Sequence, residues 1–162
     1  MSGEESLPVQ IGEVKIGYDG QSLNAILGSC IGLGFLYPDA GVYGLAHALL
    51  AKSSGSDAAG GGGRHVDQAI ETLLRKMRIP EGKERRRVKV FIAGGANMTL
   101  PAGTEARRLV GSVNADFARK AVREAGLRIC HDDTGGEFGR RVTIDCTTGE
   151  FTIDRIPRLG AA

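Results

Sequence analysis

Apolar side chains recur at helical spacing in two segments of the chain, and each segment predicts a helix. Over residues 64–78 the apolar positions follow i, i+3, i+4, i+7, i+8 and i+11, which forms one stripe along a helix that Pro80 ends. A second helix is predicted over residues 112–125, with Gly126 at its C-terminal end. Its inward-facing residues are expected to be Val113, Phe117, Ala121 and Val122.

Shorter apolar runs, bounded by glycine, proline and other turn residues, predict strands. The run over residues 21–36 is interrupted by the Gly-Ser-Cys sequence at residues 28–30 and predicts two strands or one bent strand. The Tyr-Pro-Asp-Ala-Gly sequence that follows at residues 37–41 is typical of a β-turn. The other predicted strands cover residues 9–17, 42–50, 88–93, 127–131, 141–146 and 151–155, and the last two are expected to form a hairpin.

This order of elements predicts an α+β fold, in which strands of mixed direction, mostly linked as hairpins, form one or two sheets with two helices packed on them. The chain has 162 residues, which is the length of a single domain. We expect that domain to cover residues 9–157, between a loose tail of residues 1–8 and a short tail of residues 158–162. Residues 51–63 include four consecutive glycines and are expected to form a mobile loop.

Composition and charge narrow the classes of function. The formal net charge is only +2, which argues against a dedicated nucleic-acid-binding protein. No stretch approaches the roughly 20 apolar residues that cross a bilayer, and the N-terminus is polar and acidic. We therefore expect no membrane insertion and a cytoplasmic location. The three cysteines form no CxxC pair, which predicts free thiols and gives no support to a zinc ribbon.

Cys30 is the strongest candidate for a reactive group. A cysteine in an apolar strand is most often a buried core residue. Here Gly28 and Gly32 flank it, and a bend at Ser29 would expose the sulfur and free the backbone N–H groups beside it. Such amides can lower the pKa of a thiol and hold a developing oxyanion. We therefore expect a nucleophile at Cys30, with oxyanion donors at Gly28, Ser29 and Ile31.

His47 is the candidate base. A lone histidine on an apolar strand is more often a core residue than a catalytic one. However, antiparallel pairing about the turn at Pro38 would bring His47 and Cys30 to the same end of the sheet. A thiol beside an imidazole is the minimal activated nucleophile, because the histidine accepts the thiol proton and later protonates the leaving group.

Asn24 lies six residues before Cys30 and has two interpretations. In the simpler one it is a turn or edge residue. In the other it orients the His47 ring, as an amide side chain does in Cys–His–Asn hydrolases.

Three other motifs carry weaker signals. The Cys-His-Asp-Asp sequence at residues 130–133 resembles a metal-ligand cluster, but adjacent strand residues point to opposite faces. We therefore favour a core Cys130 followed by a loop, and no metal site. The Gly-Gly-Ala-Asn sequence at residues 94–97 lacks the lysine and the spacing of a phosphate-binding loop. Three arginines at residues 85–87 indicate a solvated loop, the alternative being the docking of an acidic partner.

Taken in order, these motifs resemble the chemoreceptor glutamine deamidases of the CheD family. The Leu-Gly-Ser-Cys-Ile sequence at residues 27–31 and the Gly-Leu-Ala-His sequence at residues 44–47 resemble that family's signature. The similarity continues through the first helix, the Phe-Ile-Ala-Gly-Gly-Ala-Asn-Met sequence at residues 91–98 and the start of the second helix. It ends in the glycine-rich segment 133–140 and the C-terminal hairpin, and spans roughly residues 9–155.

The resemblance implies a fold, roles and partners. It implies a layered α/β sandwich. The family's nucleophile corresponds to Cys30, its general base to His47 and its usual third residue, a threonine, to Asn24. It further implies that receptor glutamines become glutamates, which serve as methylation sites in chemotaxis adaptation. The implied partners are the cytoplasmic domain of a methyl-accepting chemotaxis protein and a CheC-type phosphatase, and the mechanism needs no metal or organic cofactor.

The sequence leaves a second interpretation open. The chain would then keep the fold but work mainly as a binding partner that regulates a CheC-type phosphatase or a receptor. An active dyad predicts one thiol that ionises well below the ordinary value of about 8.5. A metal site at residues 130–133 is a third and weaker hypothesis.

Overall fold

The computed structural model describes residues 4–53, 62–105 and 109–158. The predicted loop 51–63 therefore lies largely outside the described residues. Within the described ranges the chain forms two α-helices and nine strands, with 3-10 turns at Pro38–Ala40 and Lys83–Arg87. The elements are β1 (Glu5–Pro8), β2 (Val14–Gly17), β3 (Gln21–Leu27), β4 (Ile31–Tyr37), β5 (Val42–Ala48), α1 (Val66–Lys76), β6 (Lys89–Gly94), α2 (Val110–Glu124), β7 (Arg128–Thr134), β8 (Gly139–Asp145) and β9 (Phe151–Ile156).

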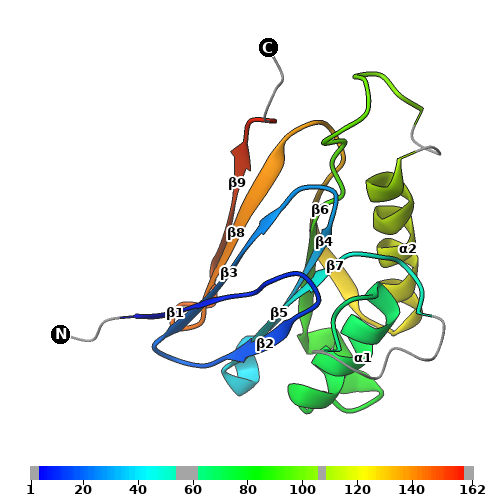
Figure 1. The fold of residues 1–162 in the computed structure, drawn as a ribbon. Helices are drawn as coiled ribbons and strands as arrows, with labels where there is room; N and C mark the ends of the chain where they lie inside the picture. Colours follow the sequence, from blue (N-terminus) through cyan, green and yellow to red (C-terminus); the bar gives the residue numbers. More distant parts are fainter. Residues whose placement is uncertain (1–3, 54–61, 106–108, 159–162) are drawn as a thin grey trace.

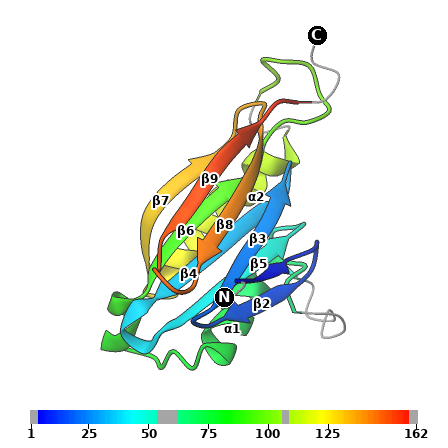
Figure 2. The same cartoon turned by 90° about the vertical axis from the view of Figure 1, so that its left-hand side faces the viewer.

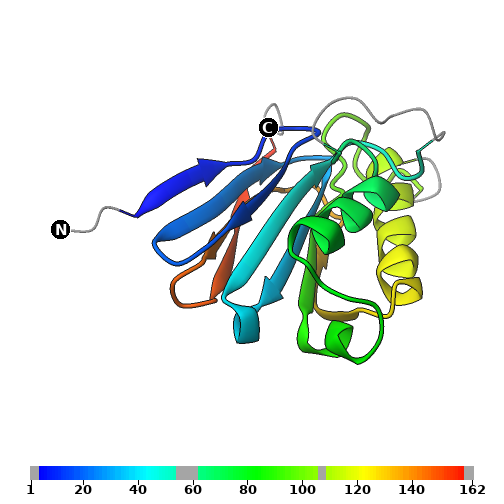
Figure 3. The same ribbon diagram turned by 90° about the horizontal axis from the view of Figure 1, so that it is seen from below.

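The strands form two sheets that stack face to face, and the two helices cover the outer face of one of them (Figures 1 and 3). The four-stranded sheet has the order β1-β3-β8-β9, and the five-stranded sheet has the order β2-β5-β4-β6-β7. Most neighbours are antiparallel, but β1 runs parallel to β3 and β7 runs parallel to β6. The predicted α+β fold and its layered arrangement of mixed, mostly antiparallel sheets are confirmed.

Two hydrophobic clusters hold the three layers together, one between the sheets and one between the five-stranded sheet and the helices. Strand β4 is buried along its whole length and separates them. Its residues Ile31, Leu33 and Phe35 pack toward the helices. Gly32 and Gly34 face the other sheet: a Cβ on Gly32 would collide with Leu27 of β3 in that sheet, and a Cβ on Gly34 would collide with the Phe91 ring of the neighbouring strand β6. The absence of side chains at these glycines is what allows the two sheets to approach.

The bend at residues 28–30, the turn at residues 38–41 and the C-terminal hairpin all form as predicted. The chain enters the sheet earlier than predicted, because residues 5–8 form β1 instead of a loose tail. The predicted strand 9–17 is reduced to β2, since residues 9–13 cross from one sheet to the other (Figure 2). Strand β1 is short and mostly exposed, so it lacks the apolar alternation that identifies a strand in a sequence.

Two further predictions about packing are wrong. Cys130 is exposed, because the register between β6 and β7 shifts at this point and leaves it at a bulge, and β7 continues to Thr134. Val113 is 48% exposed, whereas Val122 is buried and Phe117 and Ala121 pack against the core as predicted, so the buried face of α2 is centred on Ala115 and Ala118. The small residues on that face let the start of the helix come close to the glycines after β6. The buried residues of the face are Gly111, Asn114, Ala115, Ala118 and Val122.

Gly94 offers a test of the close approach at the end of β6. It has a φ of +100°, and a Cβ on it would collide with the carbonyl oxygen of Cys30. Gly20 has a similar φ of +89° but open space around the position of a Cβ. We expect Gly20→Ala to lower the free energy of unfolding by about 1 kcal/mol through the backbone alone. Gly94→Ala should lower it by about 1–3 kcal/mol more because of the collision.

Urea unfolding of the two variants measures this difference directly. Equal losses of stability in Gly94→Ala and Gly20→Ala would contradict the predicted steric contact with Cys30.

Candidate active site

Cys30 lies at the end of the bend between β3 and β4, where the loop after β6 supports it. The Gly95 N–H donates to the carbonyl of Cys30 (2.9 Å), and the Ala96 N–H donates to the carbonyl of Gly28 (3.0 Å). The thiol belongs to the cluster between the sheets and is only 7% exposed. The Gly-Gly-Ala-Asn sequence noted at residues 94–97 therefore fixes the backbone around this sulfur.

The register of β4 and β5 brings His47 to the same place. Gly32 pairs directly with His47, so both lie on one face of the sheet, the face toward the second sheet. Cys30 precedes Gly32 by two residues and packs on that same face. The register thus places both residues at the same end of the sheet.

The His47 ring has a defined hydrogen bond on one side. Its Nδ1 lies 3.0 Å from the carbonyl oxygen of Val9, which can only accept, so Nδ1 carries the proton and Nε2 is left as the basic nitrogen. Burial lowers the pKa of His47, while the bond to Val9 and the charge of Glu13 oppose this shift. The ring is 5% exposed and therefore favours the neutral form.

The expected lowering of a thiol pKa is not found. Burial raises the pKa of Cys30, because an apolar setting disfavours the charged thiolate. Burial also raises the pKa of Cys130, and together with neighbouring carboxylates it raises the pKa of Cys146 to about 11. A neutral thiol beside a neutral imidazole is a pair that exchanges a proton during reaction, in contrast to a preformed thiolate–imidazolium pair.

The Asn24 side chain links β3 to β1. Its Nδ2 donates to Ser6 Oγ (2.8 Å), while the hydrogen bond to the His47 ring involves Val9. Asn24 and His47 both line a small cavity of about 130 Å³ at the edge of the sandwich. The other lining residues of this cavity are Pro8, Val9, Gln10, Ala25 and Ile26.

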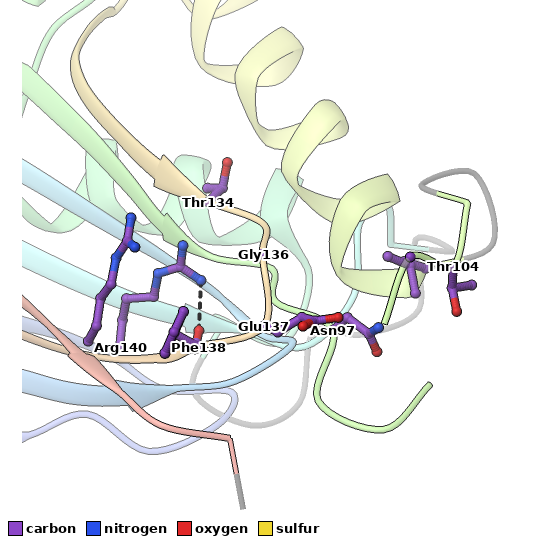
Figure 4. Close-up of a pocket in the computed structure, with 10 residues that line it drawn as sticks. Asn97, Thr104, Thr134, Gly136, Glu137, Phe138 and Arg140 are labelled. Atoms are coloured by element: carbon purple, nitrogen blue, oxygen red, sulfur yellow. Dashed lines mark hydrogen bonds between the residues drawn. The ribbon is translucent and has the colours of Figure 1, made fainter. Parts of the chain in front are cut away.

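A larger cavity of about 490 Å³ lies at the start of α2, between the loop after β6 and the loop before β8 (Figure 4). Arg140 is 3% exposed and holds the second loop, since it donates to the carbonyls of Gly135 (2.6 Å) and Phe138 (2.8 Å) and pairs with Asp133 (3.0 Å). This cavity adjoins the Cys30 bend through residues 96 and 97, because the Asn97 N–H donates to the Gly136 carbonyl. The glycine-rich segment 133–140 thus shapes one wall beside the candidate site.

The sequence at residues 130–133 does not gather around one point. Asp132 pairs with Arg119 (2.6 Å) and Asp133 with Arg140 (3.0 Å), so both carboxylates already have cationic partners. In the part of the chain that the structure describes, no three His, Cys, Asp or Glu side chains are grouped to hold a metal ion. None of the described helices is both long enough and apolar enough to span a bilayer.

Comparison with known proteins identifies the family. A relative from Ruegeria sp. (strain TM1040), named "Probable chemoreceptor glutamine deamidase CheD 2", is 53% identical over 95% of this chain and 94% of its own length. The family model described as "CheD chemotactic sensory transduction" matches residues 49–155. The chain belongs to the CheD family. This family assignment confirms the resemblance found in the motifs.

A more distant CheD relative, from Methanococcus vannielii, is 37% identical over 91% of this chain and 93% of its own length, and it too is named "Probable chemoreceptor glutamine deamidase CheD". Among solved structures, YlmD from Geobacillus stearothermophilus shares 16% identity over 82% of this chain and 59% of its own, with a TM-score of 0.45. That likeness is too distant to carry an argument.

Titration of His47 distinguishes the two possible charge states of the dyad. Because burial lowers its pKa, NMR should show His47 titrating below the ordinary histidine value of 6.5. Cys30→Ala should change this midpoint little, since a neutral thiol contributes no charge. The folded state disfavours protonated His47, so the free energy of unfolding should fall as the pH drops from 6.5 through the lowered pKa.

The alternative charge state of the two side chains predicts the opposite shift in the titration midpoint of His47. A midpoint above 6.5 that drops sharply in Cys30→Ala would show a thiolate–imidazolium pair and would contradict the neutral dyad.

Proposed function

We propose that this CheD-family chain deamidates glutamine side chains in the cytoplasmic domains of chemoreceptors, with Cys30 as the nucleophile and His47 as the general base. The observation that carries the proposal is the register of β4 and β5, which puts the sulfur and the imidazole on one face at one end of the sheet. The names of the relatives support the reaction and its substrate.

The first step is attack on the carboxamide. Nε2 of His47 takes the thiol proton as the Cys30 sulfur bonds to the side-chain carbonyl carbon of the glutamine. The carbonyl electrons move to oxygen, and the backbone amides of Gly28, Ser29 and Ile31 are the donors proposed to stabilise this oxyanion. One such donor typically contributes about 3 kcal/mol. The bonds from Gly95 and Ala96 support this role because they hold the bend rigid before substrate binds.

The second half of the reaction releases two products. Collapse of the tetrahedral intermediate breaks the C–N bond, and imidazolium His47 protonates the leaving nitrogen, so ammonia departs and a thioester remains. Neutral His47 then takes a proton from water as the water attacks the thioester. Collapse of this second intermediate returns the proton to the sulfur and yields glutamate. Protons and electrons balance within the dyad and water, so no metal or organic cofactor enters the scheme.

The proposal also covers the cellular location of the protein and a second protein partner. A receptor cytoplasmic domain is reached from the cytoplasm, where the reduced thiols of Cys30, Cys130 and Cys146 would persist. We also propose a CheC-type phosphatase as a protein partner, on the strength of the family membership.

One observation favours a second candidate function, in which the chain acts mainly as a binding partner of that phosphatase. The pKa values of the thiols of Cys30, Cys130 and Cys146 are all raised, whereas a strongly activated cysteine has a lowered one. The neutral-dyad mechanism accommodates the raised value, because His47 removes the proton only as the sulfur attacks. The two functions therefore differ in whether Cys30 is needed for turnover.

Mass spectrometry of a receptor cytoplasmic fragment tests the proposal. Incubation with the wild-type chain should add about one mass unit per converted glutamine, the difference between an amide and an acid. Cys30→Ala should lower the rate at least about a thousandfold, since it removes the attacking atom. Cys130→Ala is the matched control, because this thiol is exposed on a bulge, and it should retain the wild-type rate.

Activity that survives in Cys30→Ala would exclude the covalent mechanism. An inactive wild-type chain that still binds a CheC-type phosphatase would establish the second function in place of the first.

A further inference from the structure

The segment between β1 and β2 holds His47 on three sides. As this segment crosses from one sheet to the other, the His47 Nδ1–H donates to the Val9 carbonyl (3.0 Å). The Gly12 N–H donates to the carbonyl of His47 (2.8 Å), and the His47 N–H donates to the carbonyl of Glu13 (3.1 Å). The ring and both backbone groups of this residue are therefore fixed by three residues of one short segment, Val9, Gly12 and Glu13.

Val9 is itself held by Asn24. The Val9 N–H donates to the backbone carbonyl of Asn24 (2.7 Å), and the Val9 side chain is 2% exposed. The Asn24 side chain extends this contact, since its Nδ2 donates to Ser6 Oγ on β1 (2.8 Å). Lys15 adds a further bond, from Nζ to the carbonyl of Pro8 (2.6 Å). A continuous chain of hydrogen bonds thus runs from Ser6 through Asn24 and Val9 to the His47 ring.

The Val9 carbonyl can act as the third group beside Cys30 and His47, the one that orients the histidine ring. A hydrogen bond to one ring nitrogen of histidine fixes the tautomer and the direction in which the other nitrogen points. In other hydrolases a carboxylate or an amide side chain supplies that bond. Here a backbone oxygen occupies the position, and the side chain at residue 24 bonds elsewhere.

We propose that the Val9 carbonyl positions the His47 ring for catalysis and that Asn24 is a positioning residue that acts through Val9. The inference rests on the proposed function, in which Nε2 of His47 takes the thiol proton. Substitution at residue 9 leaves the carbonyl in place, so the proposal is tested at the residues that hold it, Ser6 and Asn24.

The tautomer of His47 is the first measurement, and it needs no activity. Long-range ¹H–¹⁵N correlation spectra distinguish a protonated ring nitrogen from a bare one, and His47→Gln assigns the signal among the three histidines. We expect the neutral ring to carry its proton on Nδ1. A neutral ring protonated on Nε2 would overturn the proposal.

The second measurement compares variants in the receptor deamidation assay. Asn24→Ala and Ser6→Ala each remove the bond between these side chains and should lower kcat about twofold to tenfold, the usual effect of one hydrogen bond, with KM unchanged. Both should also show a larger fraction of the Nε2–H tautomer. Ser6→Thr keeps the hydroxyl and should keep the wild-type kcat.

Glu5→Ala is the matched control. It removes the neighbouring side-chain bond between β1 and β3, from Gln21 Nε2 to Glu5 Oε1 (2.7 Å), which lies farther along the strands from Val9. Wild-type kcat in Glu5→Ala supports the proposal. An equal loss in Glu5→Ala, or a loss in Asn24→Ala with the tautomer unchanged, would overturn it. An inactive wild-type chain with the Nδ1–H tautomer would refute the proposed function and leave the placement of the ring intact.

Discussion

The close approach of the two sheets at β4 is the constraint on which the rest of the structure depends. Strand β4 lies under the helices on one face and under the second sheet on the other, and its glycines make room for Phe91 and Leu27. The same strand pairs with β5 on one side and β6 on the other. Its start is therefore the point where the bend with Cys30, the end of β5 with His47 and the loop after β6 come together.

Burial at this point also sets the chemistry. A thiol and an imidazole in an apolar layer both favour their uncharged forms, since a low local dielectric penalises an isolated charge. In the proposed mechanism, the energetic cost of making the thiolate is met at the moment of attack, when the proton moves from the sulfur to His47. An uncharged thiol and imidazole add no buried charge to the core, so the proposed pair is compatible with stable packing.

Much of this could be predicted from the sequence, and the failures have physical causes. The α1 stripe, the bend at residues 28–30 and the pairing of the strands through Cys30 and His47 follow from local spacing and turn residues. Strand β1 was missed because it is short and mostly exposed, and Val113 was wrongly placed inward because the buried face of α2 is lined mainly by small residues. The direction of the Cys30 pKa shift was missed because it depends on the stacking of layers that local patterns do not report.

The contact between Val9 and His47 has a consequence for comparing relatives. Every amino acid carries a main-chain oxygen, so a group of this kind imposes no residue type on its own position. A sequence alignment records only the identities of side chains, so it cannot reveal a main-chain hydrogen-bond partner, however strongly selection maintains it. Selection would instead preserve the path of the backbone past the histidine ring. The side chains that hold this path in place are free to differ from one lineage to another.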